Sequence, residues 1–237
     1  MSFVFIRVFP LILAMLPVTG LAEVNQSQFA LRALGVKVGE MALSSDINQT
    51  RYAVTGRLGT TGLAGTIKRV RFILEVTGRR KGAQFQPKRY VEDMDTGQRE
   101  SRVRLDYSRG IARASGPKVG EVSDHSVTDA QQRGAVDPLT AIFMVLRDQR
   151  EAELCTLRQK IFDGERLTEI ALTRRSNSGD MVQCSGHFTR LAGYPPGDLR
   201  QGSRFPVLVT YARSGDIMRA MRVEAKTIYG PAVVVRK

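Results

Sequence analysis

The feature that most constrains the fold is an alternation of apolar and charged residues with a period of two. In one segment, Val70, Phe72, Leu74 and Val76 alternate with Arg69, Arg71, Ile73 and Glu75. The same alternation returns over residues 102–107 and 221–226. Successive side chains of a β-strand point to opposite faces, so such a segment buries one face and leaves the other in water. The pattern therefore predicts antiparallel sheet with one solvated face.

Turn-forming residues divide the chain into many such strands. Asp163-Gly164 stands between two strand-like segments, the first expected over Glu153–Phe162, and this arrangement favours a hairpin. Residues 95–97, 178–180 and 214–216 mark further turns. Ten or more strands at this spacing predict an all-β fold, as an antiparallel curled sheet or open β-barrel. Residues 23–237 have the length of a single β-rich domain.

One part of the chain departs from the alternation. Residues 116–135 are polar and are expected to form a loop, and a helix inserted at about 137–149 should follow. Asp137 suits the N-cap and Pro138 the first helical position. Apolar residues at helical spacing follow them: Leu139, Ile142, Phe143 and Leu146. Because the rest of the helix is also apolar, we expect it to be buried. It either fills the core of the curled sheet or lines an apolar cavity for a ligand, and the two roles are compatible.

The first 22 residues have the features of a secretory signal peptide. Arg7 precedes a short apolar stretch over residues 8–18, and Gly20-Leu21-Ala22 supplies small residues for cleavage. A retained membrane anchor is the alternative. However, the stretch is shorter than the roughly 20 apolar residues of a span, and two prolines interrupt it. We therefore expect a mature chain that begins at Glu23, has no transmembrane anchor after cleavage and is soluble in the periplasm.

The chain has two cysteines, Cys155 and Cys184, and export favours a disulfide between them. Closing a loop of about 30 residues stabilises a fold by roughly 3.6 kcal/mol in the chain-entropy model. A redox or metal-binding thiol is the alternative, because Cys184 and His187 have ligand-like spacing. Zinc would need further ligands, and the only other histidine is His125. We expect a structural disulfide, no metal and no cofactor.

The charge is strongly positive, with 36 Lys and Arg against 23 Asp and Glu. Such an excess favours anionic partners. For an exported protein these are phospholipid headgroups, lipopolysaccharide phosphates or cell-wall carboxylates, and nucleic acid is not expected. Alternatively, the charge serves only solubility. Four arginines on strands expected to be neighbours would form a basic face: Arg69, Arg71, Arg102 and Arg104. This face would dock onto an anionic membrane or polymer, or would simply be solvated.

The sequence offers little that suggests catalysis. No serine lies in a G-x-S-x-G elbow, and the two histidines are the only candidate imidazole bases. Asp124-His125-Ser126 lies in the expected polar loop, where sequence neighbours rarely form a triad. The glycine-rich residues 59–65 lack the Lys-Ser/Thr ending of a phosphate-binding loop. We therefore expect a protein that is not an enzyme, with a hydrolase of unknown type as the least favoured reading.

Several short motifs stand in order along the chain. They are Leu31 to Leu43 with its Gly-Val-Lys-Val-Gly core, Tyr52 to Thr61-Gly62-Leu63, Asp137-Pro138-Leu139-Thr140-Ala141, Phe162-Asp163-Gly164, and Met221 to Val233. Together they resemble one bacterial family, the domain of unknown function 3108. The C-terminal motif departs from the family in Ala220 and Pro231, where the family has Pro and Thr. The resemblance implies an exported β-rich envelope protein without an established reaction. Its curled sheet with an inserted helix would be similar to periplasmic lipoprotein carriers, whose open barrels hold acyl chains.

The resulting functional hypothesis is a non-enzymatic envelope protein. It would bind a lipid or another amphipathic ligand within a curled β-sheet. The alternative is a structural or assembly partner that docks onto an anionic membrane or cell wall through the basic face.

Overall fold

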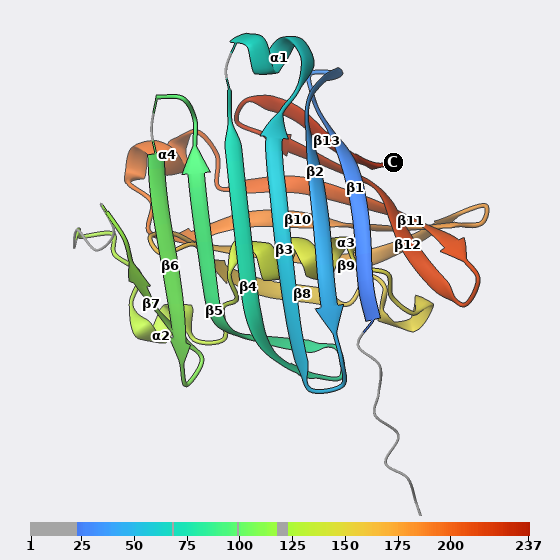
Figure 1. Cartoon of the computed structure of the whole chain (residues 1–237), viewed down its shortest axis with the longest axis horizontal. Coiled ribbons are helices and arrows are strands. Elements are labelled where there is room, and N and C mark those ends of the chain that lie inside the picture. The colour runs from blue at the N-terminus through green and yellow to red at the C-terminus, as the bar shows by residue number, and fades with distance from the viewer. Residues whose placement is uncertain (1–22, 68, 99, 118–122) are drawn as a thin grey trace, which may run out of the picture.

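The computed structural model describes residues 23–67, 69–98, 100–117 and 123–237. The signal peptide expected over residues 1–22 lies outside these ranges. One antiparallel sheet contains 13 strands, in the order β7-β6-β5-β4-β3-β2-β1-β13-β12-β11-β10-β9-β8. The sheet curls into a nearly closed barrel shape (Figure 1). The predicted curled antiparallel fold is therefore confirmed.

The strands form two meanders. The first comprises β1 (Glu23–Ala33), β2 (Val36–Ile47), β3 (Arg51–Thr60), β4 (Arg71–Lys81), β5 (Gln84–Asp95), β6 (Glu100–Ser108) and β7 (Ile111–Ser115). The second comprises β8 (Leu157–Phe162), β9 (Leu167–Ser178), β10 (Met181–Ala192), β11 (Arg204–Ser214), β12 (Ile217–Thr227) and β13 (Gly230–Arg236). The shorter helices are α1 (Gly62–Ile67), α2 (Asp129–Gln132), η1 (Glu151–Glu153) and α4 (Pro196–Arg200). The predicted hairpin at Asp163-Gly164 joins β8 to β9.

The two meanders join where the first strand meets the last. In the β1–β13 ladder Phe29 lies opposite Arg236, and Ala33 lies opposite Ala232. The first meander extends from this seam to β7, and the second extends from it to β8. The outer strands of the sheet are therefore β7 and β8, which are consecutive in the chain.

Residues 129–136, which precede α3, contact both of these edges. The Gln132 side chain accepts a hydrogen bond from the backbone N–H of Ala112 in β7 (3.0 Å). Four residues later, Val136 forms a parallel bridge with Ile161 of β8. This segment includes α2, so the expectation of a loop over residues 116–135 is wrong at residues 129–132. The helix forms there because Thr128 and Gln131 make a capping box.

The inserted helix is α3 (Pro138–Leu146), which lies inside the curl of the sheet (Figure 1). The Asp137 side chain caps it by accepting a hydrogen bond from the backbone N–H of Thr140 (2.8 Å). The helix ends at Leu146 instead of near residue 149, because Gln149 pairs its backbone with Met218 of β12 (3.1 and 2.8 Å). A long-range backbone pairing thus ends the helix.

The other departure from expectation lies just after α3. The strand expected over Glu153–Phe162 begins only at Leu157, and Glu151–Glu153 instead form the 3-10 helix η1. Glu153 is held by ion pairs with Arg147 (2.9 Å) and Arg150 (2.8 Å). These contacts and the positive φ of Cys155 (59°) turn the chain before the strand can start.

Helix α3 packs tightly against the sheet. Leu139, Phe143 and Leu146 are buried, and Ile142 is partly buried against the core. A Cβ at Gly56 of β3 would lie 2.9 Å from Cδ1 of Leu139, so the glycine permits this close approach. The helix therefore fills the middle of the curl.

Candidate functional site

A cavity of about 530 Å³ opens where α3 ends and β1 begins. We call it the end cavity. Its volume falls within the range of ligand sites, roughly 300–1,000 Å³. Its lining divides by chemistry: Leu43, Ile47, Phe85, Phe143 and Leu146 are apolar, Asn25, Gln26, Ser27, Gln28 and Ser45 are polar, Arg80, Arg147, Arg219, Arg236 and Lys237 are cationic, and Asp148 is the single carboxylate side chain. The cavity is thus both apolar and strongly positive.

The apolar wall is built around Phe85, which follows the β4–β5 turn and pairs across the hairpin with Arg80. Its ring makes edge contacts with Tyr52 (centroids 5.1 Å apart) and with Phe143 of α3 (5.5 Å). Such T-shaped pairs stabilise aromatic clusters beyond the area they bury. The Tyr52 hydroxyl lies 2.9 Å from Oγ1 of Thr140, so the cluster is also hydrogen-bonded to the start of the helix. The wall is therefore held firmly by the helix and the sheet.

Two of the cations stabilise the fold. Arg219 and Arg236 both bind Asp148, at 3.0 Å and 3.1 Å. Arg236 also donates to the carbonyl of Leu146 at the end of α3 (3.2 Å). A cation at this position satisfies a terminal helix carbonyl and interacts favourably with the negative end of the helix dipole. Burial lowers the pKa of Arg236, while Asp148 acts in the opposite direction. One carboxylate thus balances two guanidinium groups.

Arg147 and Arg80 both lie over the Phe85 ring, with their Cζ atoms 5.6 and 5.9 Å from its centroid. Arg147 is paired with Glu153, but its buried Nε has no acceptor among the described residues. Arg80 donates from Nε to the carbonyl of Gly82 (2.9 Å). Within the described ranges it pairs with no carboxylate. Arg80 is therefore the cation best placed to meet an external anion.

Only two of the four helix residues that were expected to line a cavity lie at the end cavity. Phe143 and Leu146 line the end cavity, whereas Leu139 and Ile142 are not among its lining residues. Sequence reasoning missed the arginines, since Arg80 comes from β4 and the others from the end of α3, from β12 and from β13. Such a set leaves no linear motif. The only local signal was Arg147, directly after the apolar helix.

The four arginines expected to form a basic face are Arg69, Arg71, Arg102 and Arg104. Arg71 and Arg102 both bind Asp93, at 3.2 and 2.8 Å. Arg104 binds Asp106 at 2.6 Å. The hydrogen bond from Arg102 is the main cause that holds the pKa of Asp93 below its usual value. Carboxylates on the same face thus offset much of this charge, and Arg69 stands exposed just before β4.

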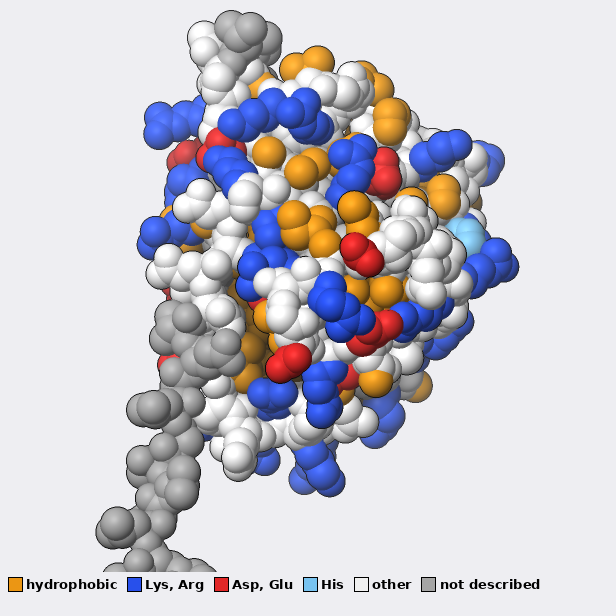
Figure 2. Space-filling model, turned by 90° about the vertical axis from the view of Figure 1, so that its right-hand side faces the viewer, with side chains coloured by type: hydrophobic (Ala, Val, Ile, Leu, Met, Phe, Trp, Pro, Cys, Tyr) orange, Lys and Arg blue, Asp and Glu red, His pale blue; other side chains and the backbone are white. Residues whose placement is uncertain are grey.

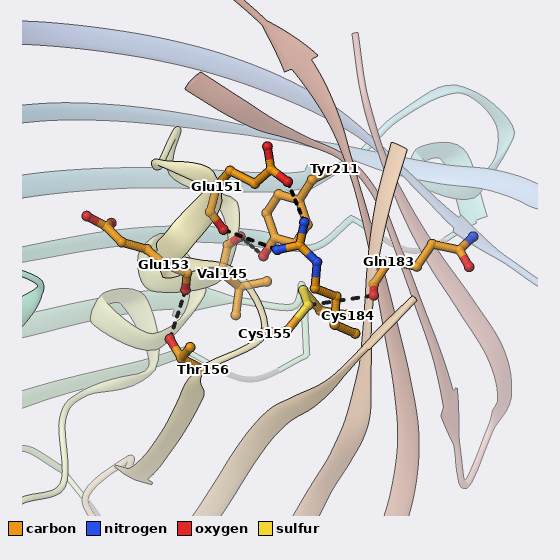
Figure 3. The surroundings of a disulfide bond; sticks show 9 residues. Val145, Glu151, Glu153, Cys155, Thr156, Gln183, Cys184 and Tyr211 are labelled. Carbon is orange, nitrogen blue, oxygen red and sulfur yellow. Dashed lines mark hydrogen bonds and ion pairs between the residues drawn. A yellow bond between two sulfur atoms is a disulfide. The ribbon is translucent and has the colours of Figure 1, made fainter. Parts of the chain in front are cut away.

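The expected disulfide is present between Cys155 and Cys184, with an S–S distance of 2.02 Å (Figure 3). It fastens the chain after η1 to β10, and Cys184 is fully buried. Nearby, the Tyr211 hydroxyl donates to the carbonyl of Val145 in α3 (3.0 Å). Because the two sulfurs are bonded to each other, neither is available as a thiolate ligand.

The two histidines lie in different settings. Nδ1 of His187 is 3.1 Å from Arg204, and its pKa is lowered by burial, by Arg204 and by Arg174. His125 is exposed, and neither imidazole pairs with a carboxylate or hydroxyl side chain in the described part of the chain. The described residues also contain no group of three or more His, Cys, Asp or Glu that could hold a metal. None of the helices in the described ranges is long and apolar enough to cross a membrane.

Among curated proteins and solved structures, none matches the chain. The comparison with family models does give a match. A family model described as "Protein of unknown function (DUF3108)" matches residues 26–188. The match runs from β1 into β10 and takes in Arg80, Phe85 and α3, but not Arg219 or Arg236. Because the matched residues make up more than half of the sequence, the chain belongs to the DUF3108 family.

Proposed function

We propose that this is a non-enzymatic binding protein that holds an anionic amphipathic ligand in the end cavity. The observation that carries the proposal is the position of Arg80 beside an apolar wall, because this guanidinium group has no carboxylate partner among the described residues. The ligand class is a molecule with a carboxylate or phosphate head and an apolar chain, such as a fatty acid or a phospholipid.

The two parts of the cavity suit the two parts of such a ligand. A hydrogen bond between a guanidinium group and an anionic oxygen is stronger than one between neutral groups. Arg147 adds a second positive charge to the lining of the cavity beside Arg80. The chain of the ligand would cover Phe85, Phe143 and Leu146, and each Å² of apolar surface removed from water contributes about 25 cal/mol.

We also propose that the protein acts in the periplasm after export, on the strength of the leader-like residues 1–22. The non-enzymatic role is supported by the surroundings of His125 and His187, neither of which is oriented by a carboxylate in the described ranges. A general base of the Ser-His-Asp type relies on such a partner.

The test measures ligand binding by protein purified in the form that the cell accumulates. Native mass spectrometry would identify any co-purified lipid, and titration with the fluorescent fatty acid cis-parinaric acid would give Kd. Arg80→Gln should weaken binding about tenfold, the lower end of the value of a hydrogen bond to a charged group. Arg79→Gln is the matched control, since it removes the same charge from an exposed neighbouring position.

A second pair of variants tests the location. Ser27→Trp places a large ring in the end cavity and should abolish binding, whereas Thr55→Trp on the exposed face of β3 should not. If cis-parinaric acid binds equally well to Ser27→Trp and to the unchanged protein, the end cavity is not the site. Equal losses for Arg80→Gln and Arg79→Gln would show that only net charge matters.

The alternative role is docking to an anionic membrane or cell wall through the four arginines of the expected basic face, and it has weaker support. Three of them already pair with Asp93 or Asp106. Charge reversal at Arg69, Arg71, Arg102 and Arg104 would test it, and an unchanged yield in a pull-down with envelope fragments would remove it.

A further inference from the structure

Two turns at the other end of β1, away from the end cavity, carry large apolar side chains into solvent. Their exposed fractions are 68 % for Leu34, 65 % for Val36, 36 % for Ile228 and 85 % for Tyr229. We call these four residues the turn patch. The β1–β2 and β12–β13 turns are neighbours, because the backbone N–H of Leu34 donates to the carbonyl of Pro231 (3.1 Å). Figure 1 shows both turns at the same end of the barrel, next to α1.

The local backbone does not account for these residues. Leu34 has φ of 51°, a left-handed conformation that glycine, asparagine and aspartate adopt more readily than leucine. Tight turns usually carry such small or polar residues. The turn patch therefore points to a surface that is covered by something other than the fold itself.

The two chain segments that carry the turn patch contain cations and no acidic residues. Residues 29–39 and 225–232 contain no Asp or Glu, and they include Arg32, Lys37 and Lys226. Lys37 is paired with Glu40 further along β2 (2.5 Å). Arg32 donates to the carbonyl of Gly35 (3.3 Å). Neither Arg32 nor Lys226 makes an ion pair with a described residue. Two uncompensated cations thus flank the exposed apolar side chains.

This arrangement differs from that of the expected basic face, where Asp93 and Asp106 offset the arginines of β4 and β6. On the face that Figure 2 presents, Lys and Arg side chains are spread widely, with acidic and hydrophobic side chains among them. Only a partner that accepts both apolar side chains and positive charge complements the turn patch.

We propose that the turn patch docks the protein onto an anionic phospholipid membrane. Leu34, Val36 and Ile228 enter the region between headgroups and acyl chains, and Tyr229 lies at the interface, where its ring and hydroxyl suit the two environments. Arg32 and Lys226 lie at the level of the lipid phosphates. This docking is separate from the end cavity and requires no ligand there.

The first test places a fluorescent probe in the patch. The chain has no tryptophan, so Tyr229→Trp introduces a single reporter at a highly exposed position. With vesicles of phosphatidylglycerol and phosphatidylcholine, its emission should shift to the blue and be quenched by brominated acyl chains. Met181→Trp, at another exposed apolar position, is the control and should show neither effect. An unchanged Tyr229→Trp spectrum would overturn the proposal.

The second test separates apolar from electrostatic contributions by vesicle sedimentation, with folding checked by circular dichroism. Leu34→Ser with Tyr229→Ser should weaken binding at least tenfold, because two apolar contacts with lipid are lost. Arg32→Gln with Lys226→Gln should weaken it by about fivefold for each charge, and added salt should reduce the binding of the unchanged protein. Arg102→Gln with Arg104→Gln removes the same net charge elsewhere and should have little effect.

Other occupants of the patch would give different results. If the protein forms a dimer in analytical ultracentrifugation that Leu34→Ser with Tyr229→Ser converts to a monomer, a second copy covers the patch and the membrane proposal is wrong. It also fails if Arg32→Gln with Lys226→Gln and Arg102→Gln with Arg104→Gln weaken vesicle binding equally. Neither result bears on cis-parinaric acid binding, so this proposal and the end-cavity proposal can fail separately.

Discussion

Asp137 should make the stability of the fold depend on pH, because its carboxyl group is wholly buried at the start of α3. Its oxygens accept hydrogen bonds from the backbone N–H of Thr140 (2.8 Å) and from its hydroxyl (2.6 Å). No cation is among the groups that shift its titration, and burial raises its pKa from 3.8 to about 6. A buried charge without a cationic partner is costly, so the protonated form is favoured in the folded state.

The raised pKa of Asp137 couples proton binding to the free energy of unfolding. Between the two pKa values the folded state binds the proton more tightly than the unfolded state. The stability that this group contributes is therefore fully present below pH 3.8 and is lost as the pH rises through about 6. A shift of about 2 units corresponds to about 3 kcal/mol, most of it between about pH 4 and about pH 7.

Asp137→Asn removes this titration and keeps an oxygen for the helix cap. We expect the free energy of unfolding of Asp137→Asn, minus that of the unchanged protein, to rise by about 3 kcal/mol over this range. Urea unfolding followed by circular dichroism at several pH values would measure it. Taking the difference cancels the titration of all other groups.

Asp129→Asn is the matched control. Asp129 is exposed, and a hydrogen bond from Arg113 is the main cause that lowers its pKa. A lowered pKa contributes stability that is present above the ordinary value and lost only as the pH falls, so the difference for Asp129→Asn should be flat above about pH 5. If the Asp137→Asn difference is equally flat, the buried carboxyl titrates alike in both states and the reasoning is refuted.

Two further predictions concern stability. Reduction of the disulfide between Cys155 and Cys184, 29 residues apart, should lower the free energy of unfolding by about 3.6 kcal/mol and Tm by roughly 7–14 °C. Calorimetry with and without a reductant checks this, and an unchanged Tm would contradict it. Leu139→Ala should cost about 2–5 kcal/mol, and Gly56→Ala should also destabilise because its methyl would meet the leucine. The double variant should be more stable than the sum of the two losses predicts, since the new methyl occupies part of the space left by the leucine, and denaturant unfolding showing simple additivity would count against this contact.

The sequence alone determined features that depend on local periodicity and local chemistry. The alternation in segments such as residues 70–76 specified strands, because a period of two buries one face of a sheet. Asp137-Pro138 specified where the inserted helix starts, because cap and first-turn preferences act over a few residues. The pairing of Cys155 with Cys184 followed from the number of cysteines and the expectation of export.

Other features were decided by contacts between residues far apart in the chain. The end of α3 at Leu146 depends on the backbone pairing of Gln149 with Met218, some 70 residues later. The helical pattern of apolar residues does not predict this pairing. The closure between the β7 and β8 edges depends on Gln132 reaching Ala112.

The candidate site and the turn patch are of the same kind. Arg80 and Phe85 meet the end of α3 only because the sheet curls, and Leu34 meets Tyr229 only because the first strand pairs with the last. Periodicity specifies which face of a strand is buried, but it does not specify which strand lies next to it. That choice depends on the packing of the whole sheet around α3, and so only the tertiary structure placed these side chains together.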